Sequence, residues 1–289
     1  MTNAMDRLYG QVADKGHVCL GLDTDYTYLP EDFAQDFSSK GEAVLAFNKA
    51  IVDQTLDVAA VYKVQIAYYE AMGLEGLRAY SETLKYLRKK GALVIADVKR
   101  GDIAKTAEMY AQAHFTGDFE ADIITVNPYM GMDTITPFFP YLEKGKGIFA
   151  LVATSNPGAM DIEGITHEGK KVYEIVGGML QKLGERFMGR CGYSAIGGVV
   201  GCTDPQATIG IRRALDKTFF LIPGYGAQGG TAQDMGRYLR DGNGGVVNSS
   251  RGVLLAYRKD AFRGMRFDGA ARAECIRMRD DIHSALKGE

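Results

Sequence analysis

Two aspartates and a lysine, Asp97, Lys99 and Asp102, stand close together at the end of an apolar segment, in the sequence ADVKRGD (96–102). Side chains alternate along a strand, so we expect Asp97 and Lys99 to point the same way, with Asp102 in the loop beyond. Lys63, in an earlier apolar segment, completes a Lys-Asp-Lys-Asp set of alternating charge. Proteins tune pKa values for proton transfer in paired charges of this kind, although a structural ion pair has the same sequence signature.

A glycine-rich segment, IPGYGAQGG (222–230), is the second candidate for chemistry. It satisfies the G-x-G-x-x-G pattern, but a dinucleotide-binding fingerprint opens the first strand–helix unit of a domain, whereas this segment comes late in the chain. Ser249, Ser250 and Arg251 follow the next apolar segment. Backbone N–H groups and an arginine in these places are typical of a phosphate site, and the alternative is a set of turn-forming glycines.

Apolar segments that run without alternation are typical of parallel strands buried on both faces, and segments with helical periodicity lie between them. Eight such segments predict a single (β/α)8 TIM barrel over residues 1–289, with an N-terminal helix. In a barrel of this kind the carboxyl ends of the strands form the active face. The predicted strands are 17–23, 58–65, 92–99, 121–128, 147–155, 194–202, 218–226 and 244–252.

Residues 155–193 separate the fifth and sixth predicted strands by more than one helix requires. We expect an extended loop and helix insertion there. Long insertions at the strand ends of a barrel often cover the site, and we expect this one and the loop near 224–230 to close on a ligand. The alternative is a passive surface decoration, since surface insertions cost little free energy.

Composition excludes several classes of function. The formal net charge is -2 and the calculated pI is about 6.1, so no basic field favours a nucleic acid or a membrane surface as partner. Four scattered cysteines and four histidines lack metal-ligand spacing, so we expect no metal and no other cofactor. With no apolar segment fit for a signal peptide or membrane helix, we expect a cytoplasmic protein.

Seven segments together resemble the orotidine 5'-phosphate decarboxylases, in the longer bacterial subfamily sometimes called type 2. The pattern D-x-K-x-x-D-I with a threonine four residues after the second Asp is specific when it occurs with PG-x-GAQGG. The resembling segments are GLD (21–23), VYKVQIAYYEAMG (61–73), ADVKRGDIAKTAEMYA (96–111), TVNPYMGMD (125–133), ATSNPG (153–158), IPGYGAQGG (222–230) and NSSRG (248–252).

The resemblance implies a metal- and cofactor-free decarboxylation of orotidine 5'-phosphate to UMP in pyrimidine biosynthesis. Lys99 would donate a proton to C6, next to Asp97, and Lys63 would hold the ribose and orient Asp97. It also implies a homodimer in which Asp102, Ile103 and Thr106 reach the partner's site. Substrate contacts would come from Asp23 at the ribose, Ser155 at the pyrimidine, and Pro223, Gln228, Ser250 and Arg251 around the base and phosphate.

Two alternatives differ in class. A sugar-phosphate decarboxylase or synthase of the same suprafamily would use a divalent metal held by acids on the second and third strands, and Lys63 opposes it. A catalytically silent phosphate-binding barrel would be expected to lack Lys99 or Asp102, and both are present. The family commonly has glycine before its phosphate-binding arginine, where this chain has Ser250.

Overall fold

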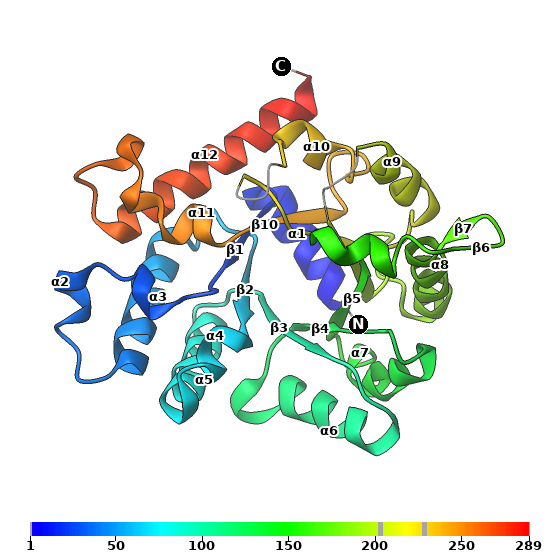
Figure 1. Ribbon diagram of the computed structural model, residues 1–289, viewed down its shortest axis with the longest axis horizontal. Helices are drawn as coiled ribbons and strands as arrows, with labels where there is room; N and C mark the ends of the chain where they lie inside the picture. Colours follow the sequence, from blue (N-terminus) through cyan, green and yellow to red (C-terminus); the bar gives the residue numbers. More distant parts are fainter. Residues whose placement is uncertain (1, 202–204, 227–229, 289) are drawn as a thin grey trace.

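A computed structural model describes residues 2–201, 205–226 and 230–288. Eight parallel strands close into a barrel in the order β1-β10-β9-β8-β5-β4-β3-β2 (Figure 1). Each of the eight predicted strands overlaps one of them, and only β3 extends beyond its predicted range, by one residue, so the predicted barrel is confirmed. Their bounds are β1 (Val18–Gly21), β2 (Val61–Gln65), β3 (Val94–Arg100), β4 (Ile123–Val126), β5 (Gly147–Ala153), β8 (Ile196–Val200), β9 (Phe220–Ile222) and β10 (Gly245–Ser249).

Helices surround the barrel, as the alternating strand and helix patterns predict (Figure 1). Helix α5 is amphipathic: Tyr80, Leu84 and Leu87 are fully buried along one stripe. The helices are α1 (Ala4–Lys15), α2 (Glu31–Ala34), α3 (Lys40–Thr55), α4 (Ile66–Glu70), α5 (Gly73–Lys89), α6 (Ala104–Phe115), α7 (Phe139–Leu142), α8 (Val172–Gly184), α9 (Pro205–Ala214), α10 (Ala232–Gly236), α11 (Arg251–Leu254) and α12 (Phe267–Lys287).

The predicted N-terminal helix, α1, is seen through the ring of strands in Figure 1. Asn3 caps it, because its side chain accepts a hydrogen bond from the Asp6 N–H at 2.8 Å. Met5 and Leu8 are fully buried in one cluster with side chains from inside the barrel. This cluster forms the apolar floor of the barrel and includes Cys19, Val61, Ile95, Ile123, Phe149 and Val246.

The layer of side chains above this floor is polar on one side of the barrel. Lys63 and Asp97 lie two residues beyond Val61 and Ile95, so their side chains also point into the barrel. Both residues are about 95% buried. These residues lie toward the carboxyl ends of β2 and β3. The barrel therefore places charged side chains at its active face, on top of an apolar core.

The extended connection after β5 divides into two parts. Residues 155–171 hold a short 3₁₀ helix, Pro157–Asp161, and a two-stranded hairpin of β6 (Thr166–His167) and β7 (Lys170–Lys171). Helix α8 then packs against β5 and β8 as an ordinary barrel helix. The insertion is present as predicted, and its additional part is the segment 155–171.

No helix in the described ranges is both long and apolar enough to cross a membrane.

Candidate active site

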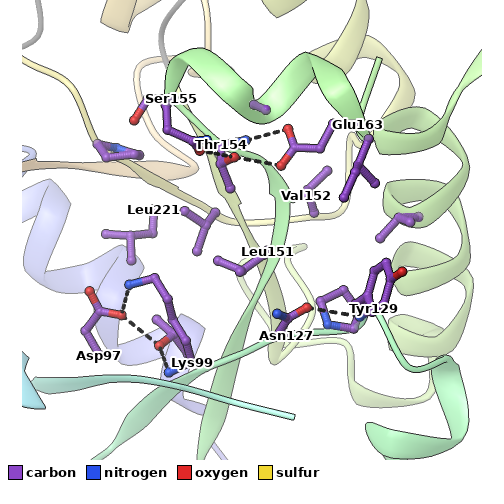
Figure 2. A pocket seen from close by; sticks show the side chains of 18 of the residues that line it. Asp97, Lys99, Asn127, Tyr129, Leu151, Val152, Thr154, Ser155, Glu163 and Leu221 are labelled. Carbon is purple, nitrogen blue, oxygen red and sulfur yellow. Dashed lines mark hydrogen bonds and ion pairs between the residues drawn. The ribbon is translucent and has the colours of Figure 1, made fainter. Parts of the chain in front are cut away.

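A cavity of about 760 Å³ opens at the carboxyl ends of the strands (Figure 2). Strands β2 to β5 and β8 to β10 all contribute to it, with Lys63, Asp97, Lys99, Thr125, Leu151, Val152, Val199, Leu221 and Asn248. The insertion and α8 form another wall, with Ala159, Ile162, Glu163, Val172 and Val176. The cavity thus joins a charged region at β2 and β3 to an apolar region beneath the insertion.

Lys63 lies between two carboxylates. Its Nζ donates to Asp23 Oδ1 at 2.8 Å and to Asp97 Oδ2 at 3.1 Å, and Lys99 Nζ donates to Asp97 Oδ1 at 2.7 Å. Figure 2 shows Lys99 meeting Asp97 at one side of the cavity. The structure therefore joins Asp23, Lys63, Asp97 and Lys99 in one network of alternating charge.

This network keeps its buried members ionised. Burial alone would raise the pKa of Asp97, but Lys63 and then Lys99 outweigh it and hold that pKa at about 2. Burial would likewise lower the pKa of Lys63, but Asp23 and Asp97 outweigh it and raise that pKa above its usual value. Asp97 is a carboxylate and Lys63 an ammonium across the whole physiological pH range.

The chain between Asp97 and Lys99 is not a regular strand. Lys99 has a φ of +43°, and the pairing of β3 with β4 shifts register between Ala96 and Arg100. The two side chains meet as predicted, but the expected reason, regular alternation, is wrong. A bulge in β3 turns Lys99 toward Asp97 and leaves its side chain 46% exposed at the cavity.

The three residues implied at a partner's site lie together at the start of α6. Ile103 is 52% exposed, Thr106 is exposed and Asp102 is half-buried. Asp102 accepts a hydrogen bond from the Ile103 N–H at 2.8 Å, and within the described part of the chain it takes part in no ion pair. None of the three lines the cavity of its own chain.

Ser250, the departure from the family pattern, has a defined contact. Its hydroxyl donates to Asp23 Oδ2 at 2.8 Å and accepts from Asn248 Nδ2 at 3.3 Å. Gly21 makes room for it, because a Cβ at position 21 would overlap the Ser250 side chain. The hydroxyl thus fixes the Asp23 oxygen that Lys63 does not bind.

The predicted phosphate loop is described in part. Pro223 lines the cavity, and Gly224 and Gly226 have φ values of +104° and +69°, which glycine adopts without strain. Gln228 lies outside the described residues. Arg251 begins α11 with an exposed side chain and does not line the cavity.

Ser155, at the other end of the cavity, follows a threonine held by the insertion. The Thr154 N–H and hydroxyl donate to the two oxygens of Glu163 at 2.8 and 2.7 Å (Figure 2). Glu163 comes from the segment 155–171. It fixes the backbone next to Ser155 and attaches the insertion to the end of β5.

Sequence reasoning did not assign a role to several polar residues of the cavity and the network, among them Gln65, Thr125, Asn248 and Glu163. Gln65 donates through Nε2 to Asp97 Oδ2 at 2.9 Å, and Thr125 Oγ1 donates to Asp97 Oδ1 at 2.9 Å. Asn248 and Glu163 line the cavity. Lys63 and Gln65 follow the alternation of β2, so the pattern could have indicated Gln65. Thr125 and Asn248 begin the resembling segments 125–133 and 248–252, whereas no local signal marks Glu163.

The described residues contain no group of three or more His, Cys, Asp or Glu side chains placed to share a metal ion. The Lys63 ammonium lies between Asp23 and Asp97 instead. It neutralises the two carboxylates that a divalent cation would need as ligands.

A parallel α/β barrel with a lysine–aspartate network at the carboxyl ends of its strands is typical of enzymes that stabilise a developing charge and transfer a proton. Residues 16–261 match the model of the orotidine 5'-phosphate decarboxylase / HUMPS family, and the chain belongs to that family.

Relatives and solved structures agree with this family. The orotidine 5'-phosphate decarboxylase of Clostridium acetobutylicum is 60% identical over 98% of this chain and 99% of its own, and that of Clostridium tetani is 55% identical over 99% of both. The structure of Leishmania donovani OMP decarboxylase is similar at a TM-score of 0.80 and 30% identity. It covers 99% of this chain and 100% of that one.

Proposed function

We propose that this protein converts orotidine 5'-phosphate to UMP and CO₂. The observation that carries the proposal is the position of Lys99, whose ammonium faces a cavity and contacts the buried Asp97 carboxylate at 2.7 Å. The name of a relative that is 60% identical over 98% of this chain, the orotidine 5'-phosphate decarboxylase of Clostridium acetobutylicum, supports it.

The reaction breaks the bond between C6 of the pyrimidine and its carboxylate carbon. CO₂ leaves, the electron pair stays on C6, and no cofactor absorbs it, so the protein must stabilise a carbanion and protonate it. Lys99 does both: its positive charge stabilises the developing carbanion, and one of its protons then moves to C6. Water returns a proton to the lysine afterwards.

Asp97 faces the position of the departing carboxylate. Its ionised state, held by Lys63 and Lys99, places a negative charge where the substrate loses one. Repulsion there favours loss of CO₂. Stabilisation of the transition state by Lys99 makes the larger contribution to the rate. Lys63 binds the ribose and orients Asp97, and Asp23 binds the ribose hydroxyls.

Phosphate and base contacts complete the site. Arg251 and Gln228 bind the phosphate, the Ser250 backbone contributes an N–H, and Pro223 and Ser155 contact the pyrimidine. Binding energy from this remote phosphate closes the segment 155–193 and the loop near 224–230 over the ring. Unchanged protease sensitivity of both segments on addition of UMP would contradict that closure.

We infer that the working form is a homodimer in the cytoplasm. Ile103, just before α6, and Thr106, in its first turn, are exposed and lie outside the cavity of their own chain. A dimer that buries this edge brings Asp102, Ile103 and Thr106 to the partner's cavity and adds the fourth charge of the set.

The test is the ultraviolet absorbance change of orotidine 5'-phosphate with purified protein in EDTA. We expect rapid conversion to UMP, because the Lys63 ammonium occupies the place between the carboxylates. No conversion by folded protein, followed by turnover of a sugar phosphate on addition of Mg²⁺, would favour the metal-dependent alternative. No turnover of either substrate would favour a silent phosphate-binding barrel.

A further inference from the structure

Thr125 lies opposite the bulge in β3. Its side chain is inside the barrel, only 1% of the residue is exposed, and it lines the cavity. On either side of it, Ala96 pairs with Ile124 and Arg100 with Val126. Four residue steps along β3 therefore face two steps along β4, and the additional residues leave the regular ladder of hydrogen bonds.

The Thr125 hydroxyl replaces the missing part of that ladder. Its Oγ1 accepts hydrogen bonds from the backbone N–H groups of Val98 at 2.9 Å and Lys99 at 2.8 Å. Its own proton is donated to Asp97 Oδ1 at 2.9 Å. A hydroxyl has one proton and two lone pairs, so these three bonds use all of them and set one orientation.

The same three bonds fix the catalytic pair. Lys99 has a left-handed backbone, which a residue with a Cβ adopts only when its surroundings impose it. Thr125 binds the N–H of this residue and also the Asp97 oxygen that receives the Lys99 ammonium. One oxygen atom thereby sets the backbone of the lysine and the position of its carboxylate partner.

We propose that Thr125 is a positioning residue, whose hydroxyl holds the bulge of β3 in the form that directs Lys99 and Asp97 into the cavity. The inference rests on the proposed function, because it assigns Thr125 an effect on proton donation by Lys99. Thr125 lies on β4 and acts on the reaction only through Lys99 and Asp97.

Thr125→Val is the first test, because it keeps the branched shape and removes the hydroxyl. We expect kcat for orotidine 5'-phosphate to fall about a hundredfold, the lower end of what a positioned acid contributes. KM and the dissociation constant of UMP should change less than about threefold, since Thr125 itself makes none of the proposed phosphate or ribose contacts and Lys63 keeps its bonds to Asp23 and Asp97. Thr125→Ser restores a hydroxyl and should return kcat to within about threefold of wild type.

The matched control is Thr55→Val. Thr55 is also a fully buried threonine, and its hydroxyl bonds the Ile51 carbonyl at 2.7 Å and the Tyr62 hydroxyl at 2.8 Å, away from the cavity. It should lose thermal stability and keep kcat. A structural role alone for Thr125 would make the two variants alike. If Thr125→Val does not fold, Thr125→Cys takes its place, since a thiol is a weak partner for N–H groups.

The outcomes distinguish the positioning role of Thr125 from the proposed decarboxylase activity. Wild-type turnover in a folded Thr125→Val protein would overturn the inference alone, as would equal losses of kcat in Thr125→Val and Thr125→Ser. Wild-type protein without decarboxylase activity would overturn the proposed function, and the positioning role with it.

Discussion

At the scale of single residues, the site depends on two lysines in different environments. Lys63 is 5% exposed and bound by two carboxylates, whereas Lys99 has an exposed side chain at the cavity and one carboxylate partner. A lysine that transfers a proton needs a free approach to the substrate and to water. Lys99 fits that role, and Lys63 fits a structural and electrostatic one.

Replacing Lys99 by alanine tests this division. We expect Lys99→Ala to fold and to bind UMP, while kcat falls by about a thousandfold or more, because a positioned acid acts mainly on the transition state. Steady-state kinetics and UMP titration check both parts. Lys85→Ala, which alters a surface lysine paired with Glu82 and Asp118, is the control and should match wild type. Turnover near wild type in Lys99→Ala would remove the proposed proton donor.

At the scale of elements, close packing between β1 and β10 sets the position of Asp23. A Cβ at Gly21 would overlap Ser250, whose hydroxyl binds Asp23. We therefore expect Gly21→Ala to displace both side chains and raise KM by about tenfold, the loss of one hydrogen bond to a charged group. The double variant Gly21→Ala/Ser250→Gly removes the overlapping side chain and should recover part of that loss. Equal KM values in the single and double variants would contradict the packing argument.

The end of β3 is held by a buried histidine. Arg100 Nε donates to His114 Nε2 at 3.2 Å, so His114 accepts there and is neutral. Burial, followed by the charge of Arg100, lowers the pKa of His114 to about 4. Nothing in the described residues partners its Nδ1.

Protonation of His114 gives a pH dependence with a definite sign. The unfolded chain binds this proton near pH 6.5 and the folded chain only near pH 4, so the free energy of unfolding falls as the pH decreases between these values. The full effect is about 3 kcal/mol. Urea unfolding from pH 7 to 4 measures it. His114→Gln keeps an acceptor for Arg100 and should flatten this part of the profile; an unchanged profile would show that His114 is not the titrating group.

The strands could be predicted from the sequence, whereas the contacts between neighbouring elements could not. Apolar segments of seven to nine residues predicted all eight strands, because burial on both faces fixes their composition. The β3 bulge could not be predicted, since it depends on a hydroxyl of the neighbouring strand, Thr125. The Glu163 contact with Thr154 depends in the same way on how an insertion folds back. Charged residues at strand ends mark a site, and their partners become visible only in the fold.

At the scale of the whole molecule, one barrel contains only part of the charged set that the family pattern implies. Asp23, Lys63, Asp97 and Lys99 form a connected network, while Asp102 lies outside it at the start of α6. A single chain with this arrangement lacks one carboxylate at its own cavity. In the homodimer proposed above, each chain would place its Asp102 at the cavity of the other, so that both sites would gain the carboxylate.

Mixed dimers test this exchange directly. Lys99→Ala and Asp102→Ala should each be nearly inactive alone, since the first lacks the proton donor and the second lacks the carboxylate given to the partner. In a mixed dimer, the Asp102→Ala chain keeps its own Lys99 and receives Asp102 from the Lys99→Ala chain, so one complete site forms. After unfolding and joint refolding of equal amounts, half of the dimers are mixed, and activity should recover to about a quarter of wild type. Size-exclusion chromatography with light scattering checks the dimer, and separately refolded variants are the control. No recovery in a sample shown to contain mixed dimers would place Asp102 at the site of its own chain, because every mixed dimer would then hold one site without Lys99 and one without Asp102.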